Sequence, residues 1–213
     1  MKGQDLLLLS KIICLGRLTA RDLLVASDND SIACTPPPLP DAHYFDSLNA
    51  AQKHLDFLFT IRGLSDSLGF SKSEVNNSFY RCLDVNLIKI DRSSNKPAVN
   101  KKVLFNFIKY GLRLVFPVKP GRIERGLPTT FAAPILSGRL LSGGELIMVW
   151  PDPLGKEMGQ AITPLYKSVP YAVKQDPELY AYLALMDAVR LGNPREMKVA
   201  LELLEEKLFH ADI

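Results

Sequence analysis

A glycine followed at once by a helix-capping pattern constrains the fold of this chain more than any other feature of its sequence. Residues 64–70 form a short amphipathic run containing Gly69, a residue that tolerates the left-handed backbone of a tight turn. Ser71 and Glu74 then stand three residues apart, the spacing of a capping box, which satisfies free amides at the start of a helix. The sequence therefore predicts a helix, a tight turn and a second helix over residues 72–85.

The expected second helix has an apolar side and a polar side. Val75, Phe79 and Cys82 recur at helical spacing, and polar residues occupy the other positions. Asn86 follows where the helix should end, and asparagine is the usual substitute for glycine in the left-handed conformation. One side is therefore expected to pack on a core while the other stays free.

A short hairpin with a basic tip is expected next. Residues 87–90 alternate in character as a strand does, residues 91–97 are turn formers, and Ala98 and Val99 can return antiparallel. Across residues 81–109, basic residues outnumber acidic ones by five. The tip and its surroundings are thus suited to a polyanionic partner.

Thirteen residues within positions 64–88 follow a pattern known from other proteins. They are Leu64, Ser65, Leu68, Gly69, Phe70, Ser71, Lys72, Ser73, Val75, Phe79, Cys82, Leu87 and Ile88. This run resembles the DNA-reading unit of bacterial winged-helix regulators of the MarR and ArsR type, although Ser65 replaces the usual alanine and Asn86 the usual glycine. The resemblance implies a winged helix-turn-helix within residues 1–116, and hence a homodimeric transcription regulator, a repressor, that binds double-stranded DNA.

Short polar side chains on a helix reach base edges when that helix enters the major groove. Asn76 and Asn77 suit bidentate contacts with adenine, and Arg81 suits guanine or a phosphate. The free amides of the helix N-terminus favour phosphate, and the hairpin would follow the backbone or enter the minor groove. The residues expected to contact DNA are Ser71, Lys72, Ser73, Asn76, Asn77, Tyr80 and Arg81 on the helix and Arg92, Ser94, Asn95 and Lys96 on the hairpin.

Other interpretations stay open at this point. Residues 64–88 also fit an ordinary helical hairpin with a solvated polar face, or a winged helix that binds protein. A further hypothesis is an antitoxin or adaptor whose segment 117–170 wraps a toxin-like partner protein.

The flanking regions predict a mainly α fold. Residues 6–13 indicate a first helix that stops at Gly16, residues 18–26 a short helix and residues 50–61 another. Residues 27–46, with the proline run at 36–40, are expected to form a loop, because proline lacks the amide donor that a helix needs. The first domain thus carries a loop insertion.

The second half, residues 117–213, is expected to serve packing and dimerisation. Residues 117–170 are rich in proline and glycine but too apolar for a free linker, which predicts an ordered irregular segment with a buried strand at 146–150. One helix is expected over residues 101–116 and a helical pair at the C-terminus. The second member of that pair has heptad spacing, which fits both intramolecular packing and a dimer seam.

Several classes of function have no support in the sequence. The cysteines at 14, 34 and 82 are widely spaced and lack a neighbouring histidine pair, so neither a disulfide framework nor a zinc site is indicated. No phosphate-binding loop or hydrolase motif is present, and we expect no enzyme activity and no cofactor. The first apolar run, residues 6–9, is too short to span a membrane, so a cytoplasmic protein is expected.

Overall fold

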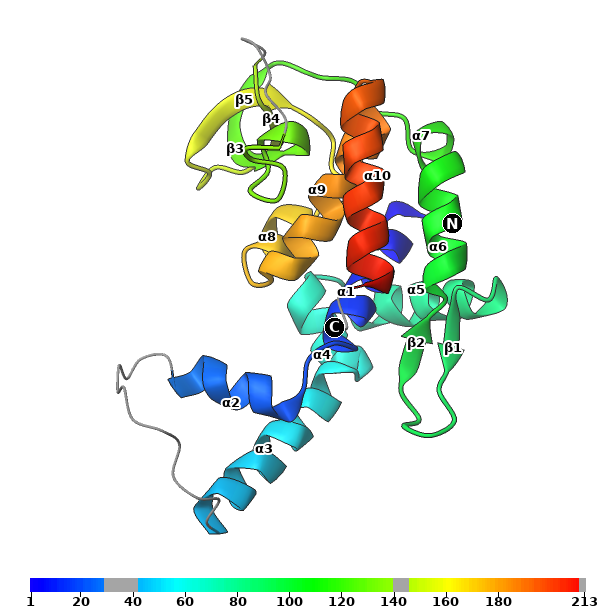
Figure 1. Ribbon diagram of the computed structural model, residues 1–213, viewed down its shortest axis with the longest axis vertical. Helices are drawn as coiled ribbons and strands as arrows, with labels where there is room; N and C mark the ends of the chain where they lie inside the picture. Colours follow the sequence, from blue (N-terminus) through cyan, green and yellow to red (C-terminus); the bar gives the residue numbers. More distant parts are fainter. Residues whose placement is uncertain (29–41, 140–145, 211–213) are drawn as a thin grey trace.

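The computed structural model describes residues 1–28, 42–139 and 146–210, which are mostly helical (Figure 1). The longer helices are α1 (Gly3–Leu15), α2 (Ala20–Asp28), α3 (Ala42–Leu58), α4 (Ile61–Leu68), α5 (Lys72–Asp84), α6 (Lys101–Tyr110), α9 (Pro177–Leu191) and α10 (Pro194–Phe209). The short ones are α7 (Leu112–Val115), α8 (Val169–Val173) and the 3-10 turn η1 (Thr130–Ala132). The strands are β1 (Ile88–Ile90), β2 (Pro97–Val99), β3 (Ile123–Thr129), β4 (Met148–Pro151) and β5 (Glu157–Ala161). The expectation of a mainly α chain with a small β-hairpin is confirmed.

Helix α1 lies at the centre of the hydrophobic core. The leucines at positions 6–9 are fully buried, as expected for a helix that is apolar all round. The helix packs against α4, α5 and β2 from the first half of the chain and against α9 from the second half. One cluster of buried side chains therefore continues across residue 116, the position where the sequence suggested a boundary between two domains.

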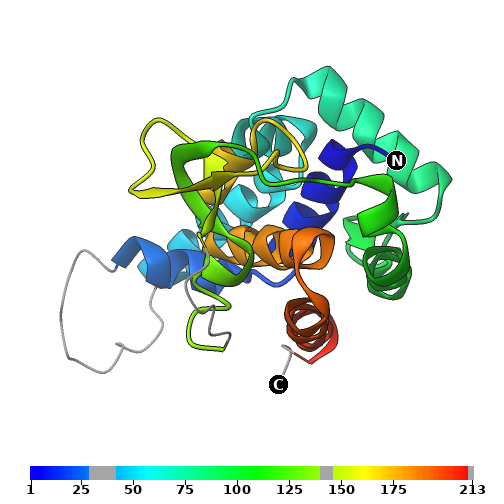
Figure 2. The same cartoon turned by 90° about the horizontal axis from the view of Figure 1, so that it is seen from above.

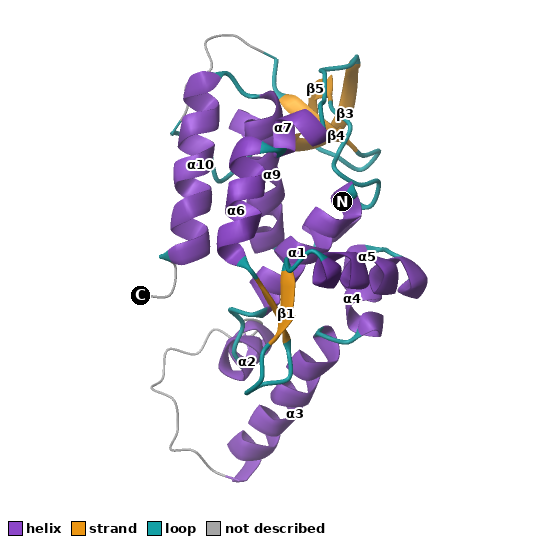
Figure 3. Ribbon diagram, turned by 90° about the vertical axis from the view of Figure 1, so that its right-hand side faces the viewer, coloured by secondary structure: helices purple, strands orange, loops and turns teal. Residues whose placement is uncertain are grey.

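Helices α2 and α3 pack against each other and project from the body of the protein (Figures 1 and 3). The expected loop over residues 27–46 is wrong at both ends, because α2 continues to Asp28 and α3 begins at Ala42. Residues 42–46 contain neither proline nor glycine, so the local sequence allows the helix to start there. The proline run at 36–40 lies outside the described residues.

Strands β3, β4 and β5 close into a small barrel. Strand β3 is antiparallel to both β4 and β5, and β4 and β5 are parallel to each other. The sequence predicted only β4 of these strands, as the strand expected at residues 146–150. It missed β3 and β5 because Gly126 and Gly159 suggested irregular structure. A Cβ at Gly126 would lie 2.1 Å from the carbonyl oxygen of Trp150, so glycine is what allows the strands to approach so closely.

A buried polar cluster attaches the barrel to α9. Asp187 accepts hydrogen bonds from Trp150 Nε1 at 2.6 Å and from Arg190 Nη1 at 2.5 Å. Arg190 also donates through Nε to the carbonyl of Phe116 at 2.9 Å. Burial raises the pKa of Asp187, although Arg190 and the other hydrogen bonds oppose that effect. The described part of residues 117–170 is thus packed on the protein's own core, and the hypothesis that it wraps a partner stays a prediction.

Helix α9 lies in the middle of the protein, with the barrel, α1 and α10 around it (Figure 2). Leu204 and Leu208 of α10 are at most 1% exposed, and α10 packs on α9 and α6. The apolar side of α10 therefore packs within the monomer, which leaves the heptad spacing explained without a dimer seam. The homodimer itself stays a prediction. The single helix expected over residues 101–116 divides at Gly111 into α6 and α7.

Candidate functional site

The turn between α4 and α5 has the geometry that the sequence predicts. Gly69 adopts the left-handed conformation with φ of 66°, and its amide donates to the carbonyl of Ser65. Ser71 accepts from the amide of Glu74, and Glu74 accepts in return from the amide of Ser71, so the capping box is confirmed. At the other end of α5, Asn86 is left-handed with φ of 57°. Local signals therefore define where α5 begins and ends.

A segment about 100 residues further along the chain braces this turn. The hydroxyl of Tyr166 donates to Glu74 Oε1 at 2.8 Å, and that of Ser168 donates to the carbonyl of Leu68 at 2.6 Å. A Cβ at Gly69 would lie 2.9 Å from the Tyr171 ring, so any other residue there would have to displace that ring. The sequence carried no signal for this brace, because the contacts depend on how the second half folds back.

The inner side of α5 is fixed to α1. Val75, Ser78 and Cys82 are buried, and the Ser78 hydroxyl donates to Asp5 Oδ1 at 2.6 Å. Asp5 is 1% exposed, and burial raises its pKa, but hydrogen bonds from Arg81, Ser78 and the amide of Lys2 outweigh burial and lower the pKa below its ordinary value. Asp5 is thus ionised at neutral pH and holds α5 in place.

Arg81 takes part in this attachment. Its Nη2 lies 2.5 Å from Asp5 Oδ1 and its Nε 3.2 Å from Asp5 Oδ2, so both carboxylate oxygens accept from the guanidinium group. Its side chain is 31% exposed. The sequence suggested Arg81 as a DNA contact, which stays a prediction, whereas the geometry gives it a positioning role between α1 and α5.

The outer side of α5 is polar and open to solvent. The side chains of Ser71, Lys72, Ser73, Asn77 and Tyr80 are exposed, and Asn76 is half-buried. Tyr80 is 56% exposed although its ring is large and apolar. We call these six residues the outer face of α5. The structure therefore brings together all of the residues expected on the helix except Arg81.

The hairpin follows α5 directly and contacts it through β1 (Figure 3). Strands β1 and β2 are antiparallel, with Ile88 opposite Val99. Asp91 organises the tip by accepting hydrogen bonds from the hydroxyls of Ser93 and Ser94 and from the amide of Ser94, and these bonds lower its pKa to about 2. The tip is thus a structured turn rather than a loose loop.

The four hairpin residues that the sequence selected differ in their surroundings. Arg92, Ser94 and Asn95 are exposed. Lys96 instead bends toward α3, where its Nζ lies 2.6 Å from Asp56 Oδ1 and 5.2 Å from the centre of the Phe59 ring. Three residues of the tip are therefore open to solvent, whereas Lys96 links the hairpin to α3.

Cys14 and Cys82 are buried free thiols, and burial raises the pKa of both. Within residues 1–28, 42–139 and 146–210, no group of His, Cys, Asp and Glu side chains is arranged to hold a metal ion. None of the helices in these ranges has both the length and the apolar character that crossing a membrane requires.

Comparisons of the chain with models of protein families, with curated proteins and with solved structures gave no match.

Proposed function

We propose that α1, α4, α5 and the β1–β2 hairpin form a winged helix-turn-helix and that the protein is a sequence-specific DNA-binding regulator of transcription. One observation carries the proposal: the outer face of α5 is polar and, apart from the half-buried Asn76, exposed, while its inner side is held by buried contacts to α1. A helix in this situation presents a rigid polar surface that fits the width of the major groove.

Each part of the surface has a distinct role in this proposal. The N-terminus of α5 faces a phosphate, which the Lys72 side chain, the helix dipole and the amides that the capping box does not use attract. Asn76 and Asn77 lie within the next two turns and read base edges. Arg92 at the hairpin tip contacts the backbone or the minor groove beside the helix.

Two of the residues selected from the sequence act indirectly. Arg81 fixes the angle of α5 through Asp5, and Lys96 fixes the hairpin through Asp56. Substituting either residue therefore changes DNA affinity through the position of the surface, with no change in which base is preferred.

Selection from a pool of random DNA duplexes tests base reading directly. The native protein should enrich a defined sequence, and the variant carrying Asn76→Ala and Asn77→Ala should lose about 1–3 kcal/mol of discrimination at each contacted position. Asn106→Ala is the matched control, because Asn106 is an exposed asparagine on α6 and belongs neither to the outer face of α5 nor to the hairpin. Retention of an unchanged sequence preference by the double variant would exclude this surface as the reader.

Salt dependence tests the phosphate contacts. Lys72→Ala and Arg92→Ala should each lower the slope of log affinity against log salt by about one, with the same loss on every duplex. The fold should stay intact, because both side chains are exposed. An unchanged slope in both variants would exclude phosphate contacts at these positions.

A further inference from the structure

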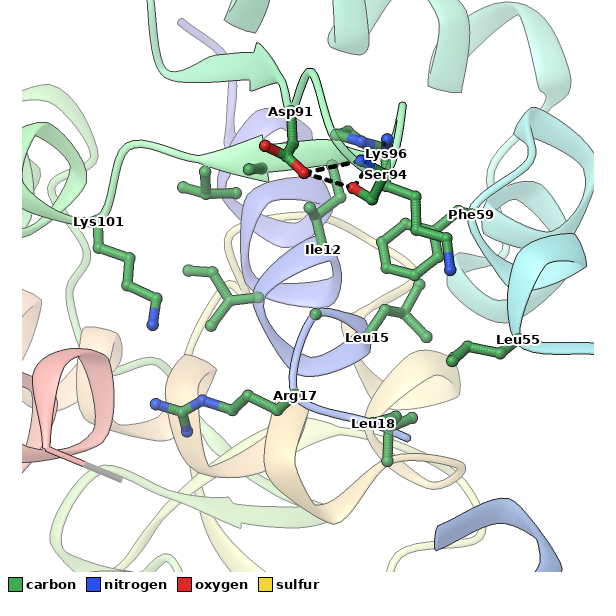
Figure 4. Close-up of a pocket in the computed structure, with 15 residues that line it drawn as sticks. Ile12, Leu15, Arg17, Leu18, Leu55, Phe59, Asp91, Ser94, Lys96 and Lys101 are labelled. Atoms are coloured by element: carbon green, nitrogen blue, oxygen red, sulfur yellow. Dashed lines mark hydrogen bonds between the residues drawn. The ribbon is translucent and has the colours of Figure 1, made fainter. Parts of the chain in front are cut away.

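A cavity of about 390 Å³ lies where the C-terminal end of α1, the last turns of α3 and the β1–β2 hairpin meet (Figure 4). Much of its wall is apolar and includes Ile12, Leu15, Leu55 and Phe59. Such a volume is within the range of small-molecule sites, which are mostly apolar with a few placed polar groups. The cavity is separate from the outer face of α5.

Arg17 is the unusual member of the wall. Its Nε and Nη2 are buried and have no hydrogen-bond partner among the described residues. The guanidinium carbon lies 5.8 Å from the centre of the Tyr182 ring, a cation–π contact that satisfies none of the buried N–H groups. Arg17 as a whole is half-buried, but buried N–H groups without an acceptor cost free energy, so this position favours an anion that supplies the missing acceptor.

Two of the cationic side chains lie apart from the most apolar part of the wall, and a third, Lys96, lies over the Phe59 ring and is paired with Asp56. Figure 4 shows the charged ends of Arg17 and Lys101 toward one side and the side chains of Leu55 and Phe59 toward the other. Asp91 lies on the hairpin wall, where its ionised carboxylate repels a second negative charge. The arrangement fits a molecule with one anionic end and an apolar body.

The volume limits the size of that molecule. A cavity of about 150 Å³ holds benzene, which has six non-hydrogen atoms, so about 390 Å³ has room for roughly 15 such atoms. We propose that this cavity binds a small monocarboxylate with an apolar body, whose carboxylate accepts hydrogen bonds from Arg17. Arginine suits this role because its N–H groups match the two oxygens of a carboxylate.

The cavity also connects to the proposed DNA surface, and this step rests on the proposed function. Ser94, Pro97 and Ala98 of the hairpin line the wall opposite α1. A bound carboxylate fixes the hairpin relative to α1 and thereby changes the affinity for DNA. Binding of the carboxylate itself does not depend on DNA and is measured without it.

Calorimetric titration of the full-length protein without DNA tests the site with three carboxylates of suitable size: octanoate, 4-phenylbutyrate and 1-naphthoate. Each is compared with the corresponding primary alcohol, which has the same apolar body without the charge. At least one acid should bind at least tenfold more tightly than its alcohol. Failure of all three acids to bind, or equal binding of acids and alcohols, would overturn the proposal.

The variant Arg17→Met separates a ligand role from a structural one. Methionine keeps the apolar stem but removes the charge, so the preference for acid over alcohol should fall at least tenfold while the melting temperature without ligand stays equal or rises. Arg21→Met, at an exposed position on α2, is the matched control and should keep the preference. A lower melting temperature of Arg17→Met with unchanged acid binding would show that Arg17 is structural.

Discussion

The contact between Asp5 and α5 gives the sharpest test of how the proposed reading helix is held. Asp5→Ala leaves the Ser78 hydroxyl, which is fully buried, without its acceptor, and an unsatisfied buried group costs about 1–3 kcal/mol. The same change removes the ion pair with Arg81, whose side chain is 31% exposed and can turn to water, so that loss adds only about 1 kcal/mol. We therefore expect the free energy of unfolding to fall by about 2–4 kcal/mol.

Urea unfolding followed by circular dichroism measures this loss. Asp84→Ala is the control, since Asp84 is an exposed carboxylate on the same helix and its removal should change stability by less than about 0.5 kcal/mol. In a double-mutant cycle with Arg81→Ala, the coupling energy between Asp5 and Arg81 should be about 1 kcal/mol. A loss under about 0.5 kcal/mol for Asp5→Ala, or strict additivity in the cycle, would refute this account of the α1–α5 contact.

The pH dependence follows from the lowered pKa of Asp5. A carboxylate whose pKa is lower in the folded state stabilises the fold above its ordinary value of 3.8, and this stabilisation is lost as the pH falls through the folded pKa. The stability difference between the native protein and Asp5→Asn should therefore be constant near neutral pH and shrink below about pH 4. A difference that grows on acidification would contradict the assigned direction.

Two further substitutions test the other contacts that hold the fold. Gly69→Ala should lower the free energy of unfolding by about 2 kcal/mol, because it combines left-handed strain with a steric clash. Gly138 is also left-handed but has open space around its Cβ position, so Gly138→Ala should cost only about 1 kcal/mol. Equal losses in urea unfolding would mean that the clash at Gly69 contributes nothing. Asp187→Ala should lower the free energy of unfolding by about 3–5 kcal/mol, since it leaves Arg190 buried without its carboxylate. It should also change the fluorescence emission of Trp150, the only tryptophan of the chain, which donates a hydrogen bond to Asp187. Native-like stability with unchanged emission would contradict the proposed cluster.

The features that sequence reasoning predicted correctly are encoded within a few neighbouring residues. The left-handed Gly69, the Ser71–Glu74 capping box and the left-handed Asn86 each depend on a local backbone preference. A local signal of this kind is visible without any knowledge of the tertiary fold. The beginning and the end of α5 were therefore predictable.

The features that sequence reasoning missed depend on distant residues. Arg81 pairs with a carboxylate 76 positions earlier in the chain, so its polar side chain suggested a free contact where the structure has an ion pair. Gly126 and Gly159 suggested irregular structure, but each permits close strand contact in the barrel. The unpaired N–H groups of Arg17 are visible only once the surrounding walls are in place.

The position of α1 has a practical consequence for anyone who wishes to excise the proposed reading unit. A fragment that ends at residue 116 would lack α9 and would leave to water part of the leucine-rich surface of α1 that α9 covers. Such a fragment would aggregate in preference to binding DNA. A minimal version of the unit must therefore retain α9, because α9 covers α1 and α1 in turn packs against α5, the proposed reading helix.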